Sequence, residues 1–392
     1  MRSTHTYNDL IKRGGVQSME KNDLFYKREL WIDPGSPLSI LFTSGSTGHP
    51  KPVVLTNIAI VNSTKILANH FGAFCLRYCA PLSMVHISTG IRGALLPSAT
   101  RCTVIIPSQA YDAAAVMRAI DEEKCTCMMA GPALFHNILA HSDRHKYSMT
   151  SLQYVSLSGT SIKPELLRKL ETELGIGRTG QVYGMTESAS LLTSSLYAKS
   201  NDNRKHTSIG QCMPHIELKL VNDNGITVPI GIQGEVWARG YSVMHGYYND
   251  CEKTAETITD DGWLRTGDLA KMDQDGYFYF VGRKKEIIIR DTGNVYPIEI
   301  EMVIGEHPSV SEVHVFSIPD SFTDAVVCAF VALQPTMTCE VEELKLFLSD
   351  KLAAYKIPEH IRFVGNFPRT STGKVSKLKL AEIMVKEINT IS

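Results

Sequence analysis

The segment Thr43-Ser-Gly-Ser-Thr-Gly-His-Pro-Lys51 follows a largely apolar run at residues 38–42. Its two glycines allow the backbone to approach an anion closely, its hydroxyl side chains are hydrogen-bond donors, and its lysine supplies positive charge. This combination is typical of a loop that binds a polyphosphate, although the spacing is not that of a Walker A loop. A Ser/Gly-rich surface turn has the same composition, so the segment alone leaves both interpretations open.

The composition narrows the class of protein. The chain has 392 residues, enough for two or three domains at about 100–200 residues each. Apolar residues make up 43% and charged residues 21%, which excludes a wholly disordered, collagen-like or coiled-coil chain. Because 40 basic residues are balanced by 41 acidic ones, the basic excess of a nucleic-acid-binding protein is absent, and we expect no nucleic acid as a partner.

The cysteines and the apolar runs bear on the location of the protein. The nine cysteines are odd in number and show no zinc-binding spacing, so we expect reduced thiols in an intracellular protein. Residues 1–30 contain no apolar stretch fit for a signal peptide, and no run approaches the ~18–20 apolar residues of a membrane span. We therefore expect a chain without a transmembrane segment.

Helical and strand-like segments alternate through the first half of the chain. The spacing of apolar residues predicts helices at residues 112–123 and 164–174, and strands at 127–130, 154–157 and 180–183. Such alternation favours an α/β domain with a largely parallel sheet.

From about Ile216 the pattern changes to alternating strands separated by Asn/Asp/Gly turns, which predicts an antiparallel lobe. The final part of the chain predicts a smaller α/β unit, with strands at 313–318 and 326–333 before a helix at 339–352. Charged residues at 282–286 interrupt the apolar pattern, so we place a domain boundary there.

Four further segments carry residues suited to nucleotide chemistry: Tyr183-Gly-Met-Thr-Glu187, Trp263-Leu-Arg-Thr-Gly-Asp268, Val281-Gly-Arg-Lys-Lys-Glu-Ile-Ile-Ile-Arg290 and Pro368-Arg-Thr-Ser-Thr-Gly-Lys374. Glu187 offers the oxygen ligand that Mg²⁺ prefers, the hydroxyl of Thr186 suits a phosphate, and the carboxylate of Asp268 suits a pair of ribose hydroxyls. Taken singly, such segments are more often a capped strand end, a tight turn, a solvated charge run and a surface loop.

In this order and spacing, the five segments resemble the motifs of the adenylate-forming superfamily, which includes acyl-CoA synthetases, firefly luciferase and the adenylation domains of peptide synthetases. They are similar to its phosphate loop, its Tyr-Gly-x-Thr-Glu, its Thr-Gly-Asp, its hinge Gly-Arg-x-Lys-[Asp/Glu] and its C-terminal Gly-Lys. Residues 208–214, 234–240 and 355–358 match as well. The stretch Gly240-Tyr-Ser-Val-Met-His-Gly-Tyr-Tyr248 looks most like the medium-chain branch called acyl-CoA synthetase family member 2.

The resemblance implies a fold of two domains. Residues 1–283 would form a large AMP-binding α/β domain, shortened at its front and carrying a distorted antiparallel lobe. Residues 284–392 would form a small, mobile C-terminal α/β lid.

The resemblance also implies a two-step reaction, that of an AMP-forming fatty acid–CoA ligase. A fatty-acid carboxylate attacks the α-phosphate of ATP to give an acyl-adenylate, and the thiol of CoA then displaces AMP. Fatty acid, ATP, CoA and Mg²⁺ are thus the implied partners. The implied location is the mitochondrion, or the cytoplasm because no targeting signal is visible.

Roles for individual residues follow from the same resemblance. Tyr183 would stack near the adenine, Thr186 would contact the α-phosphate, and Glu187 would bind Mg²⁺. Asp268, assisted by Arg283, would accept hydrogen bonds from the ribose hydroxyls. The β- and γ-phosphates would be held by the loop that consists of Thr43, Ser44, Gly45, Ser46, Thr47, Gly48, His49, Pro50 and Lys51.

Two lysines of the C-terminal part have roles in the implied motion. Lys374 would bridge the substrate carboxylate, the α-phosphate and a ribose oxygen during adenylation. Lys285 occupies the hinge position about which the lid would rotate between the two steps, withdrawing Lys374 from the site.

Departures from the family pattern change these expectations. Only 42 residues precede Thr43, so we expect strand edges and apolar faces to be uncovered. Arg290-Asp-Thr-Gly-Asn294 replaces the usual Arg-Gly-Gly-Glu-Asn and brings side chains into the expected pantetheine passage. Pro81-Leu-Ser-Met84 and Ser158-Gly-Thr-Ser161 differ from the usual acyl-pocket and adenine-pocket segments.

Three functions stay open at this point. The first is an acyl-CoA synthetase for a medium-chain fatty acid. The second is an adenylating enzyme without the thioester step, suggested by Asp291 and Thr292. The third is a shortened, non-catalytic homologue that binds nucleotide or a protein partner.

Overall fold

The computed structural model describes residues 27–43, 50–72, 75–81, 86–87, 89–108, 112–160, 162–196, 198–199, 201–290, 293–320, 324–369 and 375–391. Several positions singled out above lie outside the described residues: 44–49 of the phosphate loop, 82–84, Ser161, 291–292 and Lys374.

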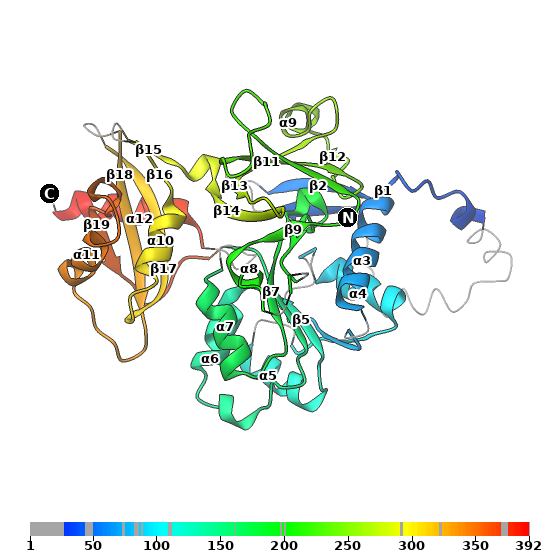
Figure 1. Cartoon of the computed structure of the whole chain (residues 1–392), viewed down its shortest axis with the longest axis horizontal. Helices are drawn as coiled ribbons and strands as arrows, with labels where there is room; N and C mark the ends of the chain where they lie inside the picture. Colours follow the sequence, from blue (N-terminus) through cyan, green and yellow to red (C-terminus); the bar gives the residue numbers. More distant parts are fainter. Residues whose placement is uncertain are drawn as a thin grey trace, which may run out of the picture.

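The centre of the larger part of the molecule is an 11-stranded sheet (Figure 1). Its order is β10 (Ile216–Val221), β11 (Gly234–Gly240), β13 (Leu264–Met272), β14 (Tyr277–Arg283), β9 (Gly210–Cys212), β8 (Thr193–Ser194), β7 (Thr179–Tyr183), β6 (Tyr154–Leu157), β5 (Cys127–Ala130), β3 (Arg77–Cys79) and β4 (Thr103–Ile105). The strands from β7 to β4 pair in parallel, and those from β10 to β7 pair antiparallel. The predicted α/β fold with an antiparallel lobe is therefore confirmed.

Helices cover both faces of the parallel part because its strands are apolar on both sides. In β5, Cys127 and Met129 pack into a core that includes α3 (Asn57–Phe71) and α4 (Gly90–Thr100). The alternate residues Met128 and Ala130 pack into a second core. That core includes α5 (Ala113–Glu122), α6 (Pro132–Ala140) and α7 (Pro164–Glu173). This alternation is the two-residue period of a strand buried on both faces, and the predicted strands and helices of this region are present.

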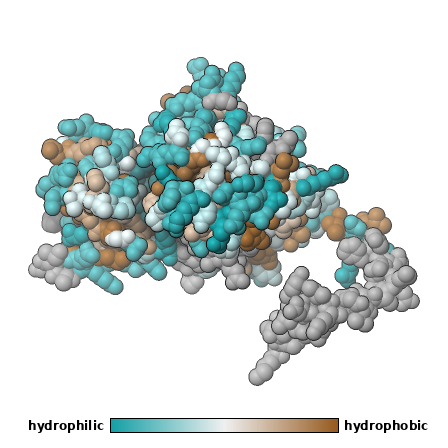
Figure 2. All heavy atoms as spheres, turned by 90° about the horizontal axis from the view of Figure 1, so that it is seen from below, coloured by the Kyte–Doolittle hydropathy of each residue, from teal (hydrophilic) through white to brown (hydrophobic). Residues whose placement is uncertain are grey.

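A smaller, three-stranded sheet lies beside the central one. It consists of β1 (Pro37–Thr43), β2 (Lys51–Thr56) and β12 (Gly246–Tyr247), with α9 (Cys251–Thr257) packed next to β12. Within the described part of the chain, β1 is an edge strand of this sheet, and its Phe42 is 67% exposed. On the face shown in Figure 2, apolar residues form several separate patches among polar ones.

Turn chemistry sets the hairpins of the antiparallel lobe. Asn222 follows β10, and its Oδ1 accepts hydrogen bonds from the backbone N–H groups of Asn224 and Ile226. Gly225 takes the positive φ of +74° that this turn requires. The short helix α8 (Arg204–Thr207) lies near β7.

The C-terminal part begins with the hairpin of β15 (Ile288–Arg290) and β16 (Gly293–Val295), followed by α10 (Pro297–Ile304). Its sheet pairs β17 (Val310–Asp320) antiparallel with β18 (Asp324–Leu333), and β18 parallel with β19 (His360–Phe363). One face packs against α10 and α11 (Val341–Ser349), and the other against α12 (Lys377–Ile391). This is the predicted smaller α/β unit, shown on the left of Figure 1.

The cysteines and the helix lengths complete the description of the fold. All nine cysteines are free thiols. Among the described residues, the helices are too short or too polar to cross a bilayer.

Candidate functional site

Asp268 lies on β13, directly opposite Arg283 of β14 in the antiparallel register. Its Oδ1 is 3.2 Å from Arg283 Nε, and the Tyr183 hydroxyl donates a 2.9 Å hydrogen bond to its Oδ2. Asp268 is only 4% exposed, so these two neighbours fix the plane of the carboxylate. The fold thus brings three candidate residues from three separate motifs into one cluster.

Side chains also hold the turn that precedes Asp268. The backbone N–H of Asp268 donates to Thr266 Oγ1 at 3.1 Å. The Thr266 hydroxyl in turn donates to the carbonyl of Val236 on β11 at 2.7 Å. Gly267 donates its N–H to Glu235 Oε1 at 3.2 Å and has a φ of +70°, which glycine adopts without steric cost. Thr-Gly-Asp is therefore a tight turn, and that turn aims the carboxylate into the cluster.

Burial and charge define the protonation states in this cluster. Burial, with the charge of Asp268 beside it, raises the pKa of the Tyr183 hydroxyl well above its usual range, so this group is a neutral donor. Burial alone would lower the pKa of Arg283, but the charges of Asp268 and Glu286 outweigh it and the pKa is raised. A carboxylate is an acceptor of the kind that sugar hydroxyls require.

Glu187 is the centre of a second cluster. It lies in the single turn η3 (Thr186–Ser188) after β7 and is 7% exposed. The Tyr247 hydroxyl donates to Glu187 Oε1 at 2.9 Å, and the backbone N–H of Met244 donates to the Glu187 carbonyl at 2.8 Å. Lys51 Nζ lies over the Tyr247 ring, 5.3 Å from its centre. Glu187 and Lys51 therefore both contact the side chain of Tyr247.

The strands β1 and β2 close the base of the phosphate-loop candidate. Thr43 and Lys51 are register partners in this antiparallel pair, so the two ends of the segment lie side by side. Pro50 is exposed next to Lys51. The residues between them, Ser44 to His49, are outside the described part of the chain.

The two clusters are electrostatic neighbours. Lys285 lies in η4 (Lys284–Glu286), and its pKa is lowered by burial and by the positive charges of Arg283 and Lys51. The charge of Glu187 in turn contributes to the raised pKa of Arg283. Lys51, Lys285, Arg283 and the two carboxylates are therefore close enough for their charges to influence one another.

Comparison with known families matches nearly the whole chain. The model of the AMP-binding enzyme family matches residues 4–248, and that of the AMP-binding enzyme C-terminal domain matches residues 299–374. The chain belongs to the AMP-binding enzyme family.

Individual relatives are similar over most of this chain. The medium-chain acyl-CoA ligase ACSF2, mitochondrial, of Danio rerio is 36% identical over 384 residues, which are 97% of this chain and 63% of that relative. The chain thus spans less than two thirds of the length of this relative.

Solved structures of the family superpose well on the chain. The amide bond synthetase McbA from Marinactinospora thermotolerans has a TM-score of 0.81 at 29% identity, over 90% of this chain and 69% of that chain. The o-succinylbenzoate CoA synthetase MenE from Bacillus subtilis, in complex with its acyl-adenylate intermediate, has a TM-score of 0.78 at 27% identity, over 89% of this chain and 70% of that chain.

In this AMP-binding enzyme, the described residues on either side of positions 370–374 make specific contacts. Arg369 and Val375 form an antiparallel bridge, and Arg369 pairs with Glu312 of β17 at 2.8 Å. Lys377 at the start of α12 pairs with Glu286 at 3.0 Å and with Glu301 of α10 at 2.9 Å.

The sequence analysis missed two contributors to the site. Tyr247 stands in a quoted motif but received no role, because its contact depends on the pairing of β12 with β2. Lys377 lies just beyond the last motif, and no local pattern links it to Glu286. A Gly-Tyr-Tyr run at a strand end is the one signal that could have pointed to Tyr247.

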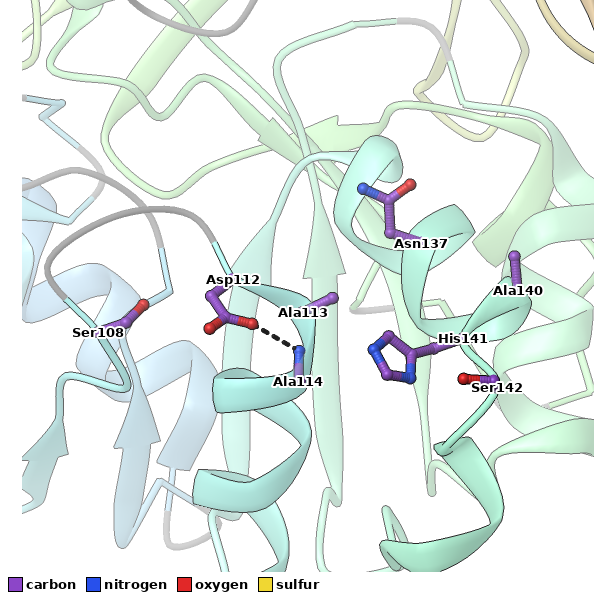
Figure 3. A pocket seen from close by; sticks show the side chains of 8 residues that line it. All are labelled: Ser108, Asp112, Ala113, Ala114, Asn137, Ala140, His141 and Ser142. Atoms are coloured by element: carbon purple, nitrogen blue, oxygen red, sulfur yellow. Dashed lines mark hydrogen bonds between the residues drawn. The ribbon is translucent and has the colours of Figure 1, made fainter.

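A pocket lies between the start of α5 and the end of α6 (Figure 3). It is open, measures about 820 Å³, and is lined by Ser108, Asp112, Ala113, Ala114, Asn137, Ala140, His141 and Ser142. The Asp112 carboxylate there accepts from the backbone N–H groups of Ala114 and Ala115, so it caps α5. A smaller cavity of about 580 Å³ has Tyr247 in its wall and adjoins the Glu187 cluster.

Proposed function

We propose that this chain is an ATP-dependent acyl-CoA synthetase that forms an acyl-adenylate from a medium-chain fatty acid and then the CoA thioester. The observation that carries the proposal is the meeting of Tyr183, Asp268 and Arg283 at one buried carboxylate, with Glu187 and Lys51 as neighbours. An arrangement of this kind suits a nucleotide, because it offers acceptors for sugar hydroxyls on one side and positive charge for phosphates on the other.

The chain's own residues would hold ATP at both ends. Asp268 would accept hydrogen bonds from the ribose hydroxyls, with its carboxylate oriented by the ion pair with Arg283. Tyr183 would lie against the adenine while its hydroxyl stays on Asp268. Lys51 and the loop from Thr43 would hold the β- and γ-phosphates, and Thr186 would contact the α-phosphate.

The surroundings of Glu187 fit a magnesium ion. Its carboxylate is a hard oxygen ligand, only one of its two oxygens receives the Tyr247 hydroxyl, and Lys51 lies close enough to share the same phosphates. Mg²⁺ held by Glu187 would supply neutralising charge to the pyrophosphate leaving group.

Residues 1–283 and 284–392 are proposed as the large domain and the mobile lid, with Lys285 as the hinge. The pairs of Lys377 with Glu286 and Glu301 tie the lid helices α10 and α12 to the hinge segment. Lys374 precedes Lys377 by three positions, so motion of this segment would move Lys374 relative to the nucleotide. Close to the nucleotide, the ammonium of Lys374 would balance the negative charge that develops at the α-phosphate.

The acyl substrate and the location are proposed from the named relative. The Danio rerio relative is called a medium-chain, mitochondrial acyl-CoA ligase. For this chain we propose a medium-chain acid such as octanoate as the substrate, and an intracellular, mitochondrial location.

A second candidate is an enzyme that adenylates an acid without forming the CoA thioester. Asp291 and Thr292 favour it, because they replace two glycines with side chains in the expected pantetheine passage. One solved structure similar to this chain is named an amide bond synthetase rather than a CoA ligase, which is consistent with this second candidate.

The deciding experiment incubates the full chain with Mg-ATP and octanoate, with and without CoA. Pyrophosphate release and octanoyl-CoA are both measured, for the wild type, for Lys374→Ala and for the control Lys379→Ala, an exposed lysine of α12. Release that is lost only in Lys374→Ala, with octanoyl-CoA as product, is the expected result. Release without octanoyl-CoA would favour the second candidate, and no release from folded protein would overturn both.

A further inference from the structure

Tyr247 contacts both charged residues of the second cluster. Its hydroxyl donates to Glu187 Oε1 at 2.9 Å, and its ring face receives Lys51 Nζ at 5.3 Å from the ring centre. It pairs with Val53 across the β12–β2 ladder, which places the ring beside the strand that begins at Lys51. The site described so far gives this buried tyrosine no task.

The backbone around Tyr247 is fixed independently of its hydroxyl. Its N–H donates to Thr254 Oγ1 at 2.9 Å, and the residue forms a bridge with Asp250. Three residues earlier, Met244 donates its N–H to the carbonyl of Glu187 at 2.8 Å. The strand segment therefore holds Glu187 at two points, by its main chain and by its carboxylate, so the hydroxyl contact is not needed to keep β12 in place.

The chemical consequence concerns the two oxygens of Glu187. The carboxylate of a glutamate can rotate about the Cγ–Cδ bond. Binding a divalent cation stops this rotation, and the lost entropy lowers the affinity for the cation. The Tyr247 hydroxyl engages Oε1, which orients the carboxylate and leaves Oε2 as the oxygen for a cation.

The aromatic ring has a related effect on Lys51. An ammonium and a carboxylate that meet directly neutralise each other, and neither is then free for a phosphate or a cation. Here the ammonium lies over the ring face and the carboxylate accepts from the hydroxyl in the ring plane. The Tyr247 side chain thereby separates the Lys51 ammonium, at its ring face, from the Glu187 carboxylate, at its hydroxyl.

We propose that Tyr247 is a positioning residue that presents the Glu187 carboxylate to the divalent cation accompanying ATP. The inference rests on the proposed function, since it requires that the chain binds ATP together with a cation. Hydrogen bonds to a metal-ligating carboxylate typically change metal affinity about 10–100-fold.

The test compares Tyr247→Phe with Tyr248→Phe. The first variant removes the hydroxyl but keeps the ring under Lys51, and the second removes a hydroxyl from the neighbouring tyrosine, which is 53% exposed. The affinity of the full chain for ATP is measured by calorimetry in EDTA and at a series of Mg²⁺ concentrations. For Tyr247→Phe, the Mg²⁺ concentration that gives half of the increase in ATP affinity is expected to be about 10-fold higher than for the wild type. The ATP affinity in EDTA is expected to be unchanged. Tyr248→Phe is expected to match the wild type.

A double variant links the effect to Glu187. In a Glu187→Gln background, Tyr247→Phe should change the Mg²⁺ requirement no further, because the carboxylate that it orients is already gone. A full additional shift in that background would overturn the inference, as would an unchanged Mg²⁺ requirement in Tyr247→Phe alone. Equal weakening of ATP in EDTA would also overturn it, since that would indicate a purely structural role.

The wild type separates the inference from the proposed function. If the wild type does not bind ATP more tightly with Mg²⁺, the proposed function fails and the inference fails with it. If the wild type does so and Tyr247→Phe behaves identically, only the inference is overturned. Should Tyr247→Phe not fold, Tyr247→His keeps a ring donor, and its Mg²⁺ requirement should then lie close to that of the wild type.

Discussion

The Tyr183 hydroxyl donates a 2.9 Å hydrogen bond to Asp268, although 85 positions separate the two residues in the chain. Tyr183 ends the last parallel strand, β7, whereas Asp268 lies on β13 in the antiparallel part of the same sheet. The bond therefore ties the two parts of the sheet together at the candidate site. Because the acceptor is charged and buried, such a bond contributes about 1.5–3 kcal/mol to stability.

The negative charge of Asp268 should matter for both nucleotide binding and folding. In Asp268→Asn the shape is kept, but the ion pair with Arg283 and the charged acceptor are lost. We expect ATP to bind about 10–100-fold more weakly, as for the loss of charge-assisted hydrogen bonds. Calorimetry measures the affinity, and denaturant unfolding is expected to show a loss of about 1–3 kcal/mol.

Asp223→Asn provides the matched control for Asp268→Asn. Asp223 pairs with Lys284 at 2.8 Å in the same lobe, but its side chain is 90% exposed. Its replacement should leave ATP affinity unchanged. Equal affinities of Asp268→Asn and the wild type would show that this carboxylate is not part of the nucleotide site.

The hydroxyl of Tyr183 should couple energetically to Asp268. Tyr183→Phe removes only the donor, so the free energy of unfolding is expected to fall by about 1.5–3 kcal/mol. In the Asp268→Asn background the same change should cost less, because the acceptor has become neutral. Urea unfolding of the four proteins of this cycle measures the difference. Equal costs in both backgrounds would mean that the two groups do not interact in solution.

The local parts of the fold could be predicted from the sequence because they depend on local periodicity. The helices α5 and α7 and the strand β5 lie where apolar spacing placed them. The helix expected at 339–352 was drawn too long, since the structure begins α11 at Val341 and ends it at Ser349. The reciprocal caps of Glu340 and Glu343 set its start, and a glutamate is an unusual capping residue to recognise in a sequence.

The site was predictable only where order and spacing resembled a known family. Asp268 and Arg283 were named from their motifs, but their pairing follows from the β13–β14 register, which no local pattern fixes. The Tyr247–Glu187 contact depends on a strand pair formed by segments far apart in the chain. Contacts of this kind need the tertiary structure, because each partner alone is an ordinary surface or strand residue in the sequence.

Gly184 should not tolerate a side chain. It lies between Tyr183 and η3, and a Cβ at this position would be 2.5 Å from the carbonyl carbon of Ser190. Because that atom is backbone, the turn that carries Glu187 would have to move. We expect Gly184→Ala to lose about 1–3 kcal/mol, the range found for overpacking, and to weaken ATP binding as well. Thermal unfolding and calorimetry measure the two effects.

Gly365→Ala is the control for Gly184→Ala. No atom lies within 4 Å of a Cβ at position 365, so stability and ATP affinity should both stay at wild-type values. If Gly184→Ala were as stable as Gly365→Ala and bound ATP as tightly, the close approach at Gly184 would not constrain the site.

The ion pair between Glu286 and Lys377 should depend on pH. Burial alone would raise the pKa of Glu286, but the charges of Lys377, Arg283 and Lys285 outweigh it and the pKa is lowered below its usual 4.5. A carboxyl group whose pKa is lower in the folded state stabilises the fold above its unfolded pKa, and that contribution is lost as the pH falls through the folded value. Glu286→Gln removes the charge at every pH, so it should unfold more easily than the wild type at pH 7, by about 1 kcal/mol.

The difference in stability between the wild type and Glu286→Gln should itself depend on pH. It should shrink as the pH falls below about 4, because the wild-type carboxyl group then also loses its charge. Thermal unfolding of both proteins between pH 3 and 7 measures it, with Glu342→Gln, whose side chain is 87% exposed, as the control that should match the wild type throughout. A difference that stays constant with pH would assign the effect to the shape of the glutamine rather than to the ion pair with Lys377.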